Sequence, residues 1–230
     1  MIKILVFGAG SDLICELIKK IYNTNKEASF TLISSSSSIK KKYSFLKGSA
    51  VFLNINYKDD LEQKLSVILK SQYFNDIYIA NGYLPTSNNM SEINKSLQIN
   101  YAIPHKLINM IINIYKEQRF RIIYFSSPAS DRPRKSNYIY GSHKALVDFT
   151  INGLRLLNPK ISFVIVKPGP TETKMTKNYL GFKHKQNTVV KSLYWQLKFG
   201  MKDIYAPIYW KLIMIIIKLI PNRIFKFINF

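Results

Sequence analysis

Short apolar runs alternate with segments of helical periodicity along most of this chain, and this alternation limits its fold more than any other feature. The apolar runs predict strands at residues 2–7, 29–33, 51–54, 76–80, 121–125, 162–166 and 204–207. Helical patterns fall near residues 13–21, 61–69, 92–116 (bent near Pro104) and 138–157. Strands that alternate with helices form βαβ units, in which helices cover both faces of a parallel sheet. We therefore expect an α/β fold built on a doubly wound parallel sheet.

Polar or glycine-containing turns follow four of the predicted strands. They are Gly8, Asn81-Gly82, Ser126-Ser127 and Pro168-Gly169. Sheets of this kind bind ligands beyond the carboxyl ends of their strands. Because all four turns sit at such ends, they predict a binding site along one edge of the sheet.

The size and composition of the chain fit a single domain. Its 230 residues are 47% hydrophobic, which is enough for a sizeable core. We expect a domain over residues 1–207, followed by an apolar and basic tail over residues 208–230. The single cysteine, Cys15, excludes an internal disulfide framework, and we expect it to be a small buried side chain. The first residues resemble a strand rather than an export signal, so we expect a cytoplasmic protein.

The net charge of +21 predicts attraction to phosphate groups on a nucleotide, an anionic lipid or a nucleic acid. The imbalance is strongest over residues 177–230, which hold ten basic residues and one acidic residue. A composition rich in Lys, Asn, Ile and Tyr would also produce this charge without any such role. Because no RNA-binding or helix-turn-helix pattern accompanies the charge, we expect no nucleic-acid partner. A non-catalytic, basic nucleotide- or nucleic-acid-binding protein is kept as an alternative.

Tyr140 and Lys144 lie four residues apart in a predicted helix, so their side chains share one face. An ammonium group beside a phenol favours the phenolate and lowers its pKa from about 10. Such a phenol can exchange a proton with a carbonyl oxygen. The spacing alone is unspecific, because the chain contains five such pairs: Tyr22/Lys26, Tyr43/Lys47, Tyr140/Lys144, Tyr179/Lys183 and Tyr194/Lys198.

The surroundings of the Tyr140/Lys144 pair distinguish it from the other four. Ser127 lies 13 residues before Tyr140 at a strand end, Asn100 lies in the preceding helix, and Pro168-Gly169 follows the next strand. Together with the glycine turn after the first strand, this set resembles the short-chain dehydrogenase/reductase family over residues 2–176. The resemblance implies a Rossmann-type fold and an NAD(P)-dependent oxidoreductase that acts on CH–OH or carbonyl groups.

The same resemblance implies a role for each residue of the set. Tyr140 is the general acid and base that protonates the substrate oxygen, and Ser127 hydrogen-bonds the substrate carbonyl. Lys144 binds the nicotinamide ribose and lowers the pKa of Tyr140. Asn100 bends its helix and holds a water that relays protons to Lys144.

The resemblance also implies contacts to the cofactor along the same edge of the sheet. They are Gly8, Ser11, Asp12 and Leu13 in the glycine turn, Asn54 and Ile55 at the adenine, Asn81 and Gly82 beneath the ribose, and Pro168, Gly169 and Thr173 at the nicotinamide, with Tyr140 and Lys144 completing the set. The three histidines show no metal-ligand spacing, so we expect no metal site.

The glycine turn departs from the family pattern of three glycines. Asp12 and Ile14 occupy the second and third glycine positions, and Ala80-Asn81-Gly82 replaces the usual Asn-Ala-Gly. The start of the first helix still offers its amides to a phosphate. A carboxylate at Asp12 is unfavourable there unless it turns away or caps the helix, so these changes bear on cofactor affinity.

The end of the second predicted strand favours NADP over NAD. A carboxylate at this point would select NAD by bonding the adenosine 2′-hydroxyl. Ile33 is instead followed by the serine run Ser34–Ser38 and by Lys40–Lys42. Cations without an acid tolerate a 2′-phosphate better, and NAD stays open as the second cofactor.

The chain changes character after residue 176. In the family, the stretch that matches residues 177–200 is a mobile lid over the substrate, and here it is basic and aromatic. Residues 212–220 carry only one charge, Lys218, and are too short to span a bilayer. With the cations and aromatic residues of 222–230, they predict a segment that lies in a membrane interface. Packing on a partner subunit or on the chain's own domain is the alternative.

Within the family, the chain resembles decaprenylphosphoryl-2-keto-pentose reductase-like enzymes. The resemblance rests on Asp12, the run from Ser136 to Lys144, and an apolar tail broken by Pro221. It implies a lipid-linked keto sugar of cell-envelope polysaccharide synthesis, reduced at the inner face of the cytoplasmic membrane. A flavin-dependent oxidase that supplies the keto sugar is the implied partner, and a homo-oligomer is expected. Reduction of a soluble small ketone, with the tail used for oligomer packing, is the alternative.

Overall fold

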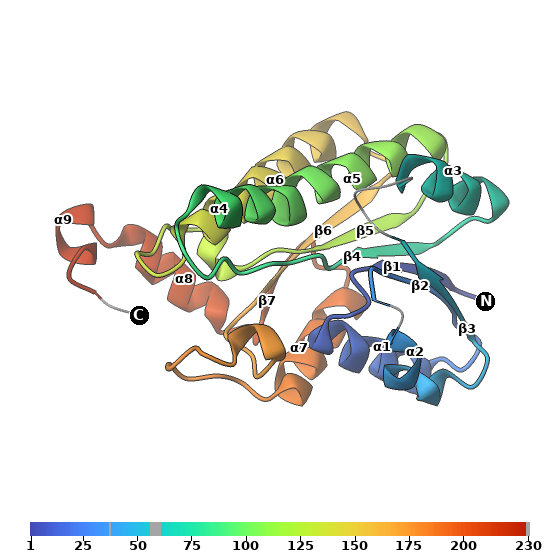
Figure 1. Cartoon of the computed structure of the whole chain (residues 1–230), viewed down its shortest axis with the longest axis horizontal. Helices are drawn as coiled ribbons and strands as arrows, with labels where there is room; N and C mark the ends of the chain where they lie inside the picture. Colours follow the sequence, from blue (N-terminus) through green and yellow to red (C-terminus); the bar gives the residue numbers. More distant parts are fainter. Residues whose placement is uncertain (37, 56–60, 229–230) are drawn as a thin grey trace.

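A computed structural model describes residues 1–36, 38–55 and 61–228, and these residues form one seven-stranded parallel sheet with helices on both faces (Figure 1). The strands are β1 (Lys3–Phe7), β2 (Ser29–Ser34), β3 (Ala50–Asn54), β4 (Asp76–Ile79), β5 (Arg121–Phe125), β6 (Ser162–Pro168) and β7 (Asp203–Ala206). The α-helices are α1 (Asp12–Thr24), α2 (Ile39–Lys42), α3 (Leu61–Ser71), α4 (Met90–Leu97), α5 (Ile103–Ile114), α6 (Tyr138–Leu157), α7 (Gln186–Lys198), α8 (Trp210–Leu219) and α9 (Asn222–Phe225). The predicted α/β class and parallel sheet are confirmed. Ser37 of the serine run and residues 229–230 of the predicted tail lie outside the described residues.

The strand order is β3-β2-β1-β4-β5-β6-β7, so the winding reverses between β1 and β4. Alternate residues of β1 enter two different cores. Ile4 and Val6 belong to one core, and Leu5 and Phe7 belong to the other. A strand buried on both faces must be apolar throughout, which is why β1 shows no alternation in the sequence. In sheets of this kind the ligand crevice lies at the reversal point, so we expect the binding site at the carboxyl ends of β1 and β4.

Two helical layers cover the sheet. Figure 1 shows α1, α2 and α7 on one face and α3, α4, α5 and α6 on the other. The first core takes Leu17 from α1 and Leu193 from α7, and the second takes Leu107 from α5 and Val147 from α6. These side chains are fully buried, so the helices that carry the predicted site residues have fixed positions on the sheet.

The predicted long helix near residues 92–116 is interrupted earlier than expected. A π-helical turn, η2 (Gln98–Ala102), separates α4 from α5. Pro104 lies in the first turn of α5, directly after this π-helical turn. The irregularity is therefore centred on Asn100 rather than on the proline.

The structure divides the predicted lid over residues 177–200 into two parts. Residues 177–185 contain no regular helix or strand. The remainder is largely α7, which buries Val189, Val190 and Leu193 in the core. A helix packed in the core cannot move as a lid. The predicted lid is therefore limited to residues 177–185.

The tail begins with α8, which packs lengthwise on the domain. Met214 and Ile217 are buried beside Tyr205 of β7, and Trp210 lies over Gly169. The apolar side chains on the other side of the tail are exposed: Leu212, Ile215, Ile216, Leu219, Ile224 and Phe227. Among the described residues, no helix combines the length and the apolar character needed to cross a membrane.

Candidate active site

Gly8 ends β1 in a conformation that only glycine adopts without strain. Its φ is +76°, and a Cβ at this position would lie 2.7 Å from the carbonyl carbon of Ala80. The backbone therefore turns tightly against the end of β4, and the Gly8 carbonyl accepts a hydrogen bond of 3.0 Å from the Ser11 amide. Ser11 is the N-cap of α1, so the turn opens on a helix N-terminus at the crevice.

Asp12 neither caps α1 nor points freely at the crevice. Its Oδ1 pairs with Lys42 Nζ at 2.7 Å, and its Oδ2 accepts a hydrogen bond of 3.0 Å from the Lys174 amide. Lys42 Nζ also donates to the Gly10 carbonyl at 2.8 Å. Burial opposes ionisation, but these partners outweigh it and hold the pKa of Asp12 below its usual value. The unfavourable carboxylate anticipated from the sequence is thus turned toward two lysines.

The other departure in the glycine turn is absorbed by the core. Ile14, at the position of the third family glycine, is fully buried, and Leu13 beside it is also buried. Their side chains belong to the first core, under the sheet. Ile14 therefore adds an apolar side chain to the core at a position where a glycine would let α1 approach the sheet more closely.

Lys144 is almost fully buried at the carboxyl ends of β4 and β5. Its Nζ donates to the carbonyls of Asn81 at 2.9 Å and Phe125 at 2.8 Å. Burial lowers the pKa of Lys144 to about 7, and the negative charge of Asp148 opposes that shift. A lysine that changes its charge near neutral pH is a candidate for a site that moves protons.

Tyr140 lies one turn before Lys144 on α6, with the Lys144 Nζ 5.9 Å from the centre of its ring. Burial raises the pKa of Tyr140 to about 12, the nearby side chain of Ser127 opposes the shift, and the charge of Asp148 adds to it. The sequence predicted a lower pKa from the ammonium of Lys144. The structure differs because burial dominates and the ammonium faces two backbone carbonyls.

Ser127 begins a short 3-10 turn, η3 (Pro128–Ser130), directly after β5. Its hydroxyl accepts a hydrogen bond from the Ala129 amide at 3.2 Å, and its side chain lies close enough to the Tyr140 phenol to oppose the rise in the pKa of that phenol. Gly141 brings the two together, because a Cβ there would lie 2.5 Å from the Ala129 carbonyl oxygen. The sequence reading missed Gly141, although a glycine inside a helix was the available signal.

Asn100 is fully buried at the centre of the π-helical turn. Its Oδ1 accepts from the Tyr83 amide at 3.0 Å, and its Nδ2 donates to the Tyr83 carbonyl at 2.7 Å and to Ser96 Oγ at 2.9 Å. The Ser96 hydroxyl also bonds His143 Nδ1 at 3.0 Å. Asn100 thus ties the segment after β4 to the face of α6 that carries Lys144.

Two of the residues predicted to contact a cofactor, Asn81 and Gly82, follow β4 and lie beside Lys144. Asn81 Oδ1 is buried and has no hydrogen-bond partner among the described residues. Gly82 lies between Asn100 and Lys144, whose Oδ1 and Nζ are each 4.0 Å from where a Cβ would stand. An orphaned buried acceptor beside a glycine turn and a helix N-terminus fits a dinucleotide at this edge.

The segment after β6 closes the crevice on its other side. The Gly169 amide donates to the Ala206 carbonyl at 2.9 Å, which fixes the Pro168-Gly169 turn to β7. Thr173 caps the 3-10 turn η4 (Lys174–Thr176), and the Lys174 amide reaches Asp12 across the crevice. The predicted nicotinamide segment and the glycine turn are therefore directly joined.

Asn54 and Ile55 lie apart from this group, at the end of β3. Ile55 is buried, Asn54 is exposed, and the Ile55 amide donates to the Ser34 carbonyl at 3.1 Å. A pocket of about 500 Å³ adjoins them, lined by Leu53, Asn54, Ile55, Gln63, Lys64, Val67 and Ile68. An aromatic base fits a pocket with this mixed lining better than a charged group does.

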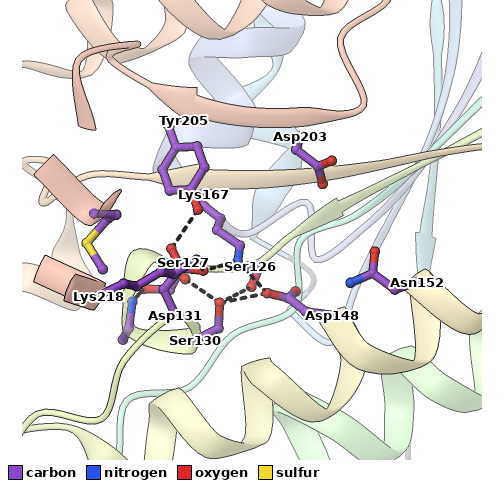
Figure 2. A network of polar contacts seen from close by, with 12 residues as sticks. Ser126, Ser127, Ser130, Asp131, Asp148, Asn152, Lys167, Asp203, Tyr205 and Lys218 are labelled. Atoms are coloured by element: carbon purple, nitrogen blue, oxygen red, sulfur yellow. Dashed lines mark hydrogen bonds and ion pairs between the residues drawn. The ribbon is translucent and has the colours of Figure 1, made fainter. Parts of the chain in front are cut away.

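Buried charges behind the Tyr140 helix were not anticipated from the sequence. Lys167 of β6 lies between Asp131 and Asp148, and Figure 2 shows these side chains pointing toward one another close to Ser126 and Ser127. The three residues are far apart in the chain, so no spacing indicated the contact. A lysine at the end of an otherwise apolar strand was the one available signal.

Comparison with known proteins agrees with this geometry. A family model described as short chain dehydrogenase matches residues 3–182. The bulky-bulky ketone specific alcohol dehydrogenase of Comamonas testosteroni is 17% identical, with 96% of each chain covered and a TM-score of 0.79. A Burkholderia cenocepacia short chain dehydrogenase in complex with NADP is 16% identical, with 89% of this chain and 87% of that one covered and a TM-score of 0.73. A Brucella melitensis 3-ketoacyl-(acyl-carrier-protein) reductase complexed with NADH is also 16% identical, with 89% of this chain and 96% of that one covered and a TM-score of 0.75.

These solved structures share the fold, and the family model covers most of the chain and every predicted site residue. The matched range contains the glycine turn, Asn100, Ser127, Tyr140, Lys144 and the segment through Thr173. The chain therefore belongs to the short chain dehydrogenase family, whose members are NAD(P)-dependent oxidoreductases acting on carbonyl and hydroxyl groups.

Proposed function

We propose that this chain reduces a keto group to a hydroxyl, with Tyr140 as the proton donor and NADPH as the preferred cofactor. The observation that carries the proposal is the meeting of α6 with the end of β5, where Lys144 Nζ donates to the Phe125 carbonyl and Gly141, beside Tyr140, packs against the turn that follows Ser127. When bound, the cofactor supplies the hydride. All other steps fall to side chains of the chain itself.

Ser127 orients the substrate oxygen toward Tyr140, because Ser127 begins η3 and Gly141, beside Tyr140, packs closely against that turn. A Tyr140 pKa of about 12 keeps the phenol protonated at neutral pH. A protonated phenol is ready to donate to the oxygen that gains charge during reduction. Lys144, whose pKa is about 7, is placed to return a proton to the site through its own ammonium.

The preference for NADPH rests on the end of β2. Ser34 closes that strand without a carboxylate, and Lys40 and Lys41 are exposed on the neighbouring helix α2. Lys42 is engaged with Asp12 and Gly10, so we assign the 2′-phosphate to the other two lysines. The Burkholderia structure with NADP supports this choice, and the Brucella structure with NADH keeps NAD as the second candidate.

For the substrate, we propose a keto sugar on a lipid carrier, presented at the inner face of a membrane. The exposed apolar side chains of α8 and α9, with Lys211, Arg223 and Lys226 among them, support a tail that rests on an anionic bilayer surface. Residues 177–185, with exposed Leu180 and Phe182, would cover the bound substrate as a lid. A flavin-dependent oxidase that supplies the keto sugar is part of the same proposal.

A second candidate is a soluble small ketone, reduced by a homo-oligomer. It is favoured by a row of exposed apolar side chains on α6, namely Leu146, Phe149, Leu156 and Leu157. Such a row on one helix face fits contact with a second copy of the chain. In this version the tail serves packing, as its buried Met214 and Ile217 already do within the chain.

The proposed chemistry is tested by Tyr140→Phe, with Tyr138→Phe as the matched control. Tyr138 lies two residues earlier on the same helix and is 47% exposed. Turnover is measured as the oxidation of NADPH in the presence of a panel of ketones. The affinity for NADPH is measured separately by equilibrium binding. We expect Tyr140→Phe to lose about 10²–10⁴-fold in kcat while NADPH binding is kept, because only the proton donor is removed. Retained turnover would contradict the role of Tyr140.

The two substrate classes are separated by flotation with phosphatidylglycerol vesicles. If the membrane version holds, the wild type floats with the vesicles at physiological salt, and Arg223→Gln/Lys226→Gln does so markedly less. If the protein stays off the vesicles and turns over soluble ketones as an oligomer, the second candidate replaces the first.

A further inference from the structure

A ladder of alternating charges runs behind the Tyr140 helix, outside the crevice. Lys167 Nζ lies 2.7 Å from Asp131 Oδ1 and 2.9 Å from Asp148 Oδ2, and Lys218 Nζ of α8 lies 3.1 Å from Asp131. Tyr205 donates its hydroxyl proton to Asp131 at 2.6 Å. The side chains of Asp131, Asp148 and Lys167 are 4%, 10% and 13% exposed, so these charges interact with little screening by water.

The ladder is joined to the backbone of the catalytic serine. Ser130 Oγ is within hydrogen-bond distance of the Ser127 carbonyl, at 2.7 Å, and of Asp148 Oδ2, at 2.6 Å (Figure 2). Ser126 Oγ donates to Ser130 Oγ at 3.3 Å. The turn that carries Ser127 is therefore tied to α6 through Asp148, four residues after Lys144.

Asp148 depends on Lys167 more than Asp131 does. Asp131 has Tyr205 and Lys218 as further partners. Asp148 Oδ2 has Ser130 besides Lys167, and its Oδ1 is buried with no hydrogen-bond partner among the described residues. Without Lys167, Asp148 would keep its negative charge with one neutral partner.

The charge of Asp148 reaches the proposed catalytic pair. Burial raises the pKa of Tyr140 and lowers that of Lys144, and the negative charge of Asp148 adds to the first shift and opposes the second. The other groups around Lys144 are the carbonyls of Asn81 and Phe125 and the ring of Tyr124, none of which carries a full charge. An uncompensated Asp148 would hold a proton on Lys144 more tightly and oppose ionisation of Tyr140.

We propose that Lys167 is a positioning residue for Tyr140 and Lys144, acting through Asp148. Its ammonium holds Asp148 in the bond to Ser130, which fixes the Ser127 turn against α6, and it offsets the negative charge behind the pair. The role as a positioning residue for catalysis rests on the proposed function. The electrostatic link between Lys167 and Lys144 does not, and it is measured without turnover.

The test follows the charge of Lys144 by NMR in protein labelled with ¹³Cε-lysine, whose chemical shift reports protonation. Lys144→Arg assigns the resonance. In the wild type we expect Lys144 to titrate near pH 7, well below the ordinary lysine value of about 10.4. In Lys167→Met we expect the midpoint to rise by about one unit, and in Asp148→Asn to fall, with the double variant returning toward the wild type.

The matched control is Lys160→Met, which removes an exposed ion pair with Glu117 and should leave the Lys144 midpoint unchanged. An unchanged midpoint in Lys167→Met, or a change in the same direction for both single variants, would overturn the proposal. Should Lys167→Met fail to fold, Asp148→Asn alone decides through its downward shift, and Lys167→Arg should restore the wild-type midpoint.

Turnover separates this proposal from the proposed function. If the wild type reduces a ketone, Lys167→Met should lose about tenfold in kcat with little change in NADPH affinity, and the pH at which kcat is half-maximal should move with the Lys144 midpoint. If the wild type reduces no ketone, the proposed function fails while the NMR result still stands or falls by itself.

Discussion

Each of the two sides of the crevice holds a charged side chain close to the proposed binding site, but the two side chains are held in different ways. On the β5–α6 side, Lys144 is buried and is held by two backbone carbonyls, with Asp148 and Lys167 behind it. On the β1–α1 side, Asp12 stays near the surface and is paired directly with Lys42. The catalytic side is therefore set by burial and fixed geometry, and the cofactor side is set by an ion pair that solvent can reach.

Because one side depends on burial and the other on an ion pair, we expect them to respond differently to pH. The largest effect on stability should come from Lys144. In the folded protein Lys144 is neutral above about pH 7, whereas in the unfolded chain it stays protonated to about pH 10.4. Unfolding therefore takes up a proton in this window, so the contribution of Lys144 to stability rises with pH.

Urea unfolding at pH 6 and at pH 9.5 measures this contribution. We expect wild type to gain roughly 2–4 kcal/mol more than Lys144→Met between the two pH values. Lys135→Met, at an exposed lysine, should follow the wild-type slope. Equal slopes for wild type and Lys144→Met would mean that Lys144 is not neutralised by burial.

A second prediction concerns the close approach of η3 to α6 on the catalytic side of the crevice. Gly141→Ala would place a Cβ 2.5 Å from the Ala129 carbonyl oxygen, so we expect a loss of about 1–3 kcal/mol in the free energy of unfolding. Gly153→Ala, in the same helix with nothing within 4 Å, should gain about 0.5–1 kcal/mol.

Urea unfolding of Gly141→Ala and Gly153→Ala under the same conditions measures both changes in the free energy of unfolding. A Gly141→Ala protein as stable as wild type would show that η3 shifts without cost and does not fix Ser127. Because Gly153 lies on the same exposed face as Phe149 and Leu156, a loss of stability there would indicate a close contact with a second copy of the chain.

The sequence was enough to predict the alternation of strands and helices and the residues of the candidate active site. Ser127, Tyr140 and Lys144 were found because Ser127 lies at a strand end 13 residues before Tyr140, and Tyr140 and Lys144 share one helix face. The structure places Lys144 at the end of the same strand, where its Nζ donates to the Phe125 carbonyl. Asn100 was found in the same way, although the turn around it is π-helical and begins before Pro104.

The supporting charges could not be predicted, because they depend on pairs that are distant in the chain. Lys167 and Asp131 are 36 residues apart, and Lys42 and Asp12 are 30 apart. A charge seen alone in the sequence has many partners within reach, and only the packing of the sheet selects one. The raised pKa of Tyr140 was missed for the same reason, since burial is a property of the fold and not of the Tyr140/Lys144 spacing.

The smallest expected effect lies on the cofactor side, and it tests whether the Asp12–Lys42 pair limits binding. Asp12→Asn removes a carboxylate from the glycine turn and releases Lys42 toward the phosphates. We expect NADPH to bind about threefold more tightly, because the pair is partly exposed and screened by water.

Fluorescence titration at low and at physiological salt measures this affinity, with Glu16→Gln on the same helix as the control. The gain should shrink at higher salt. Weaker binding in Asp12→Asn would mean instead that the bond from Asp12 to the Lys174 amide holds the crevice together, and the cofactor side would then depend on fixed geometry as the catalytic side does.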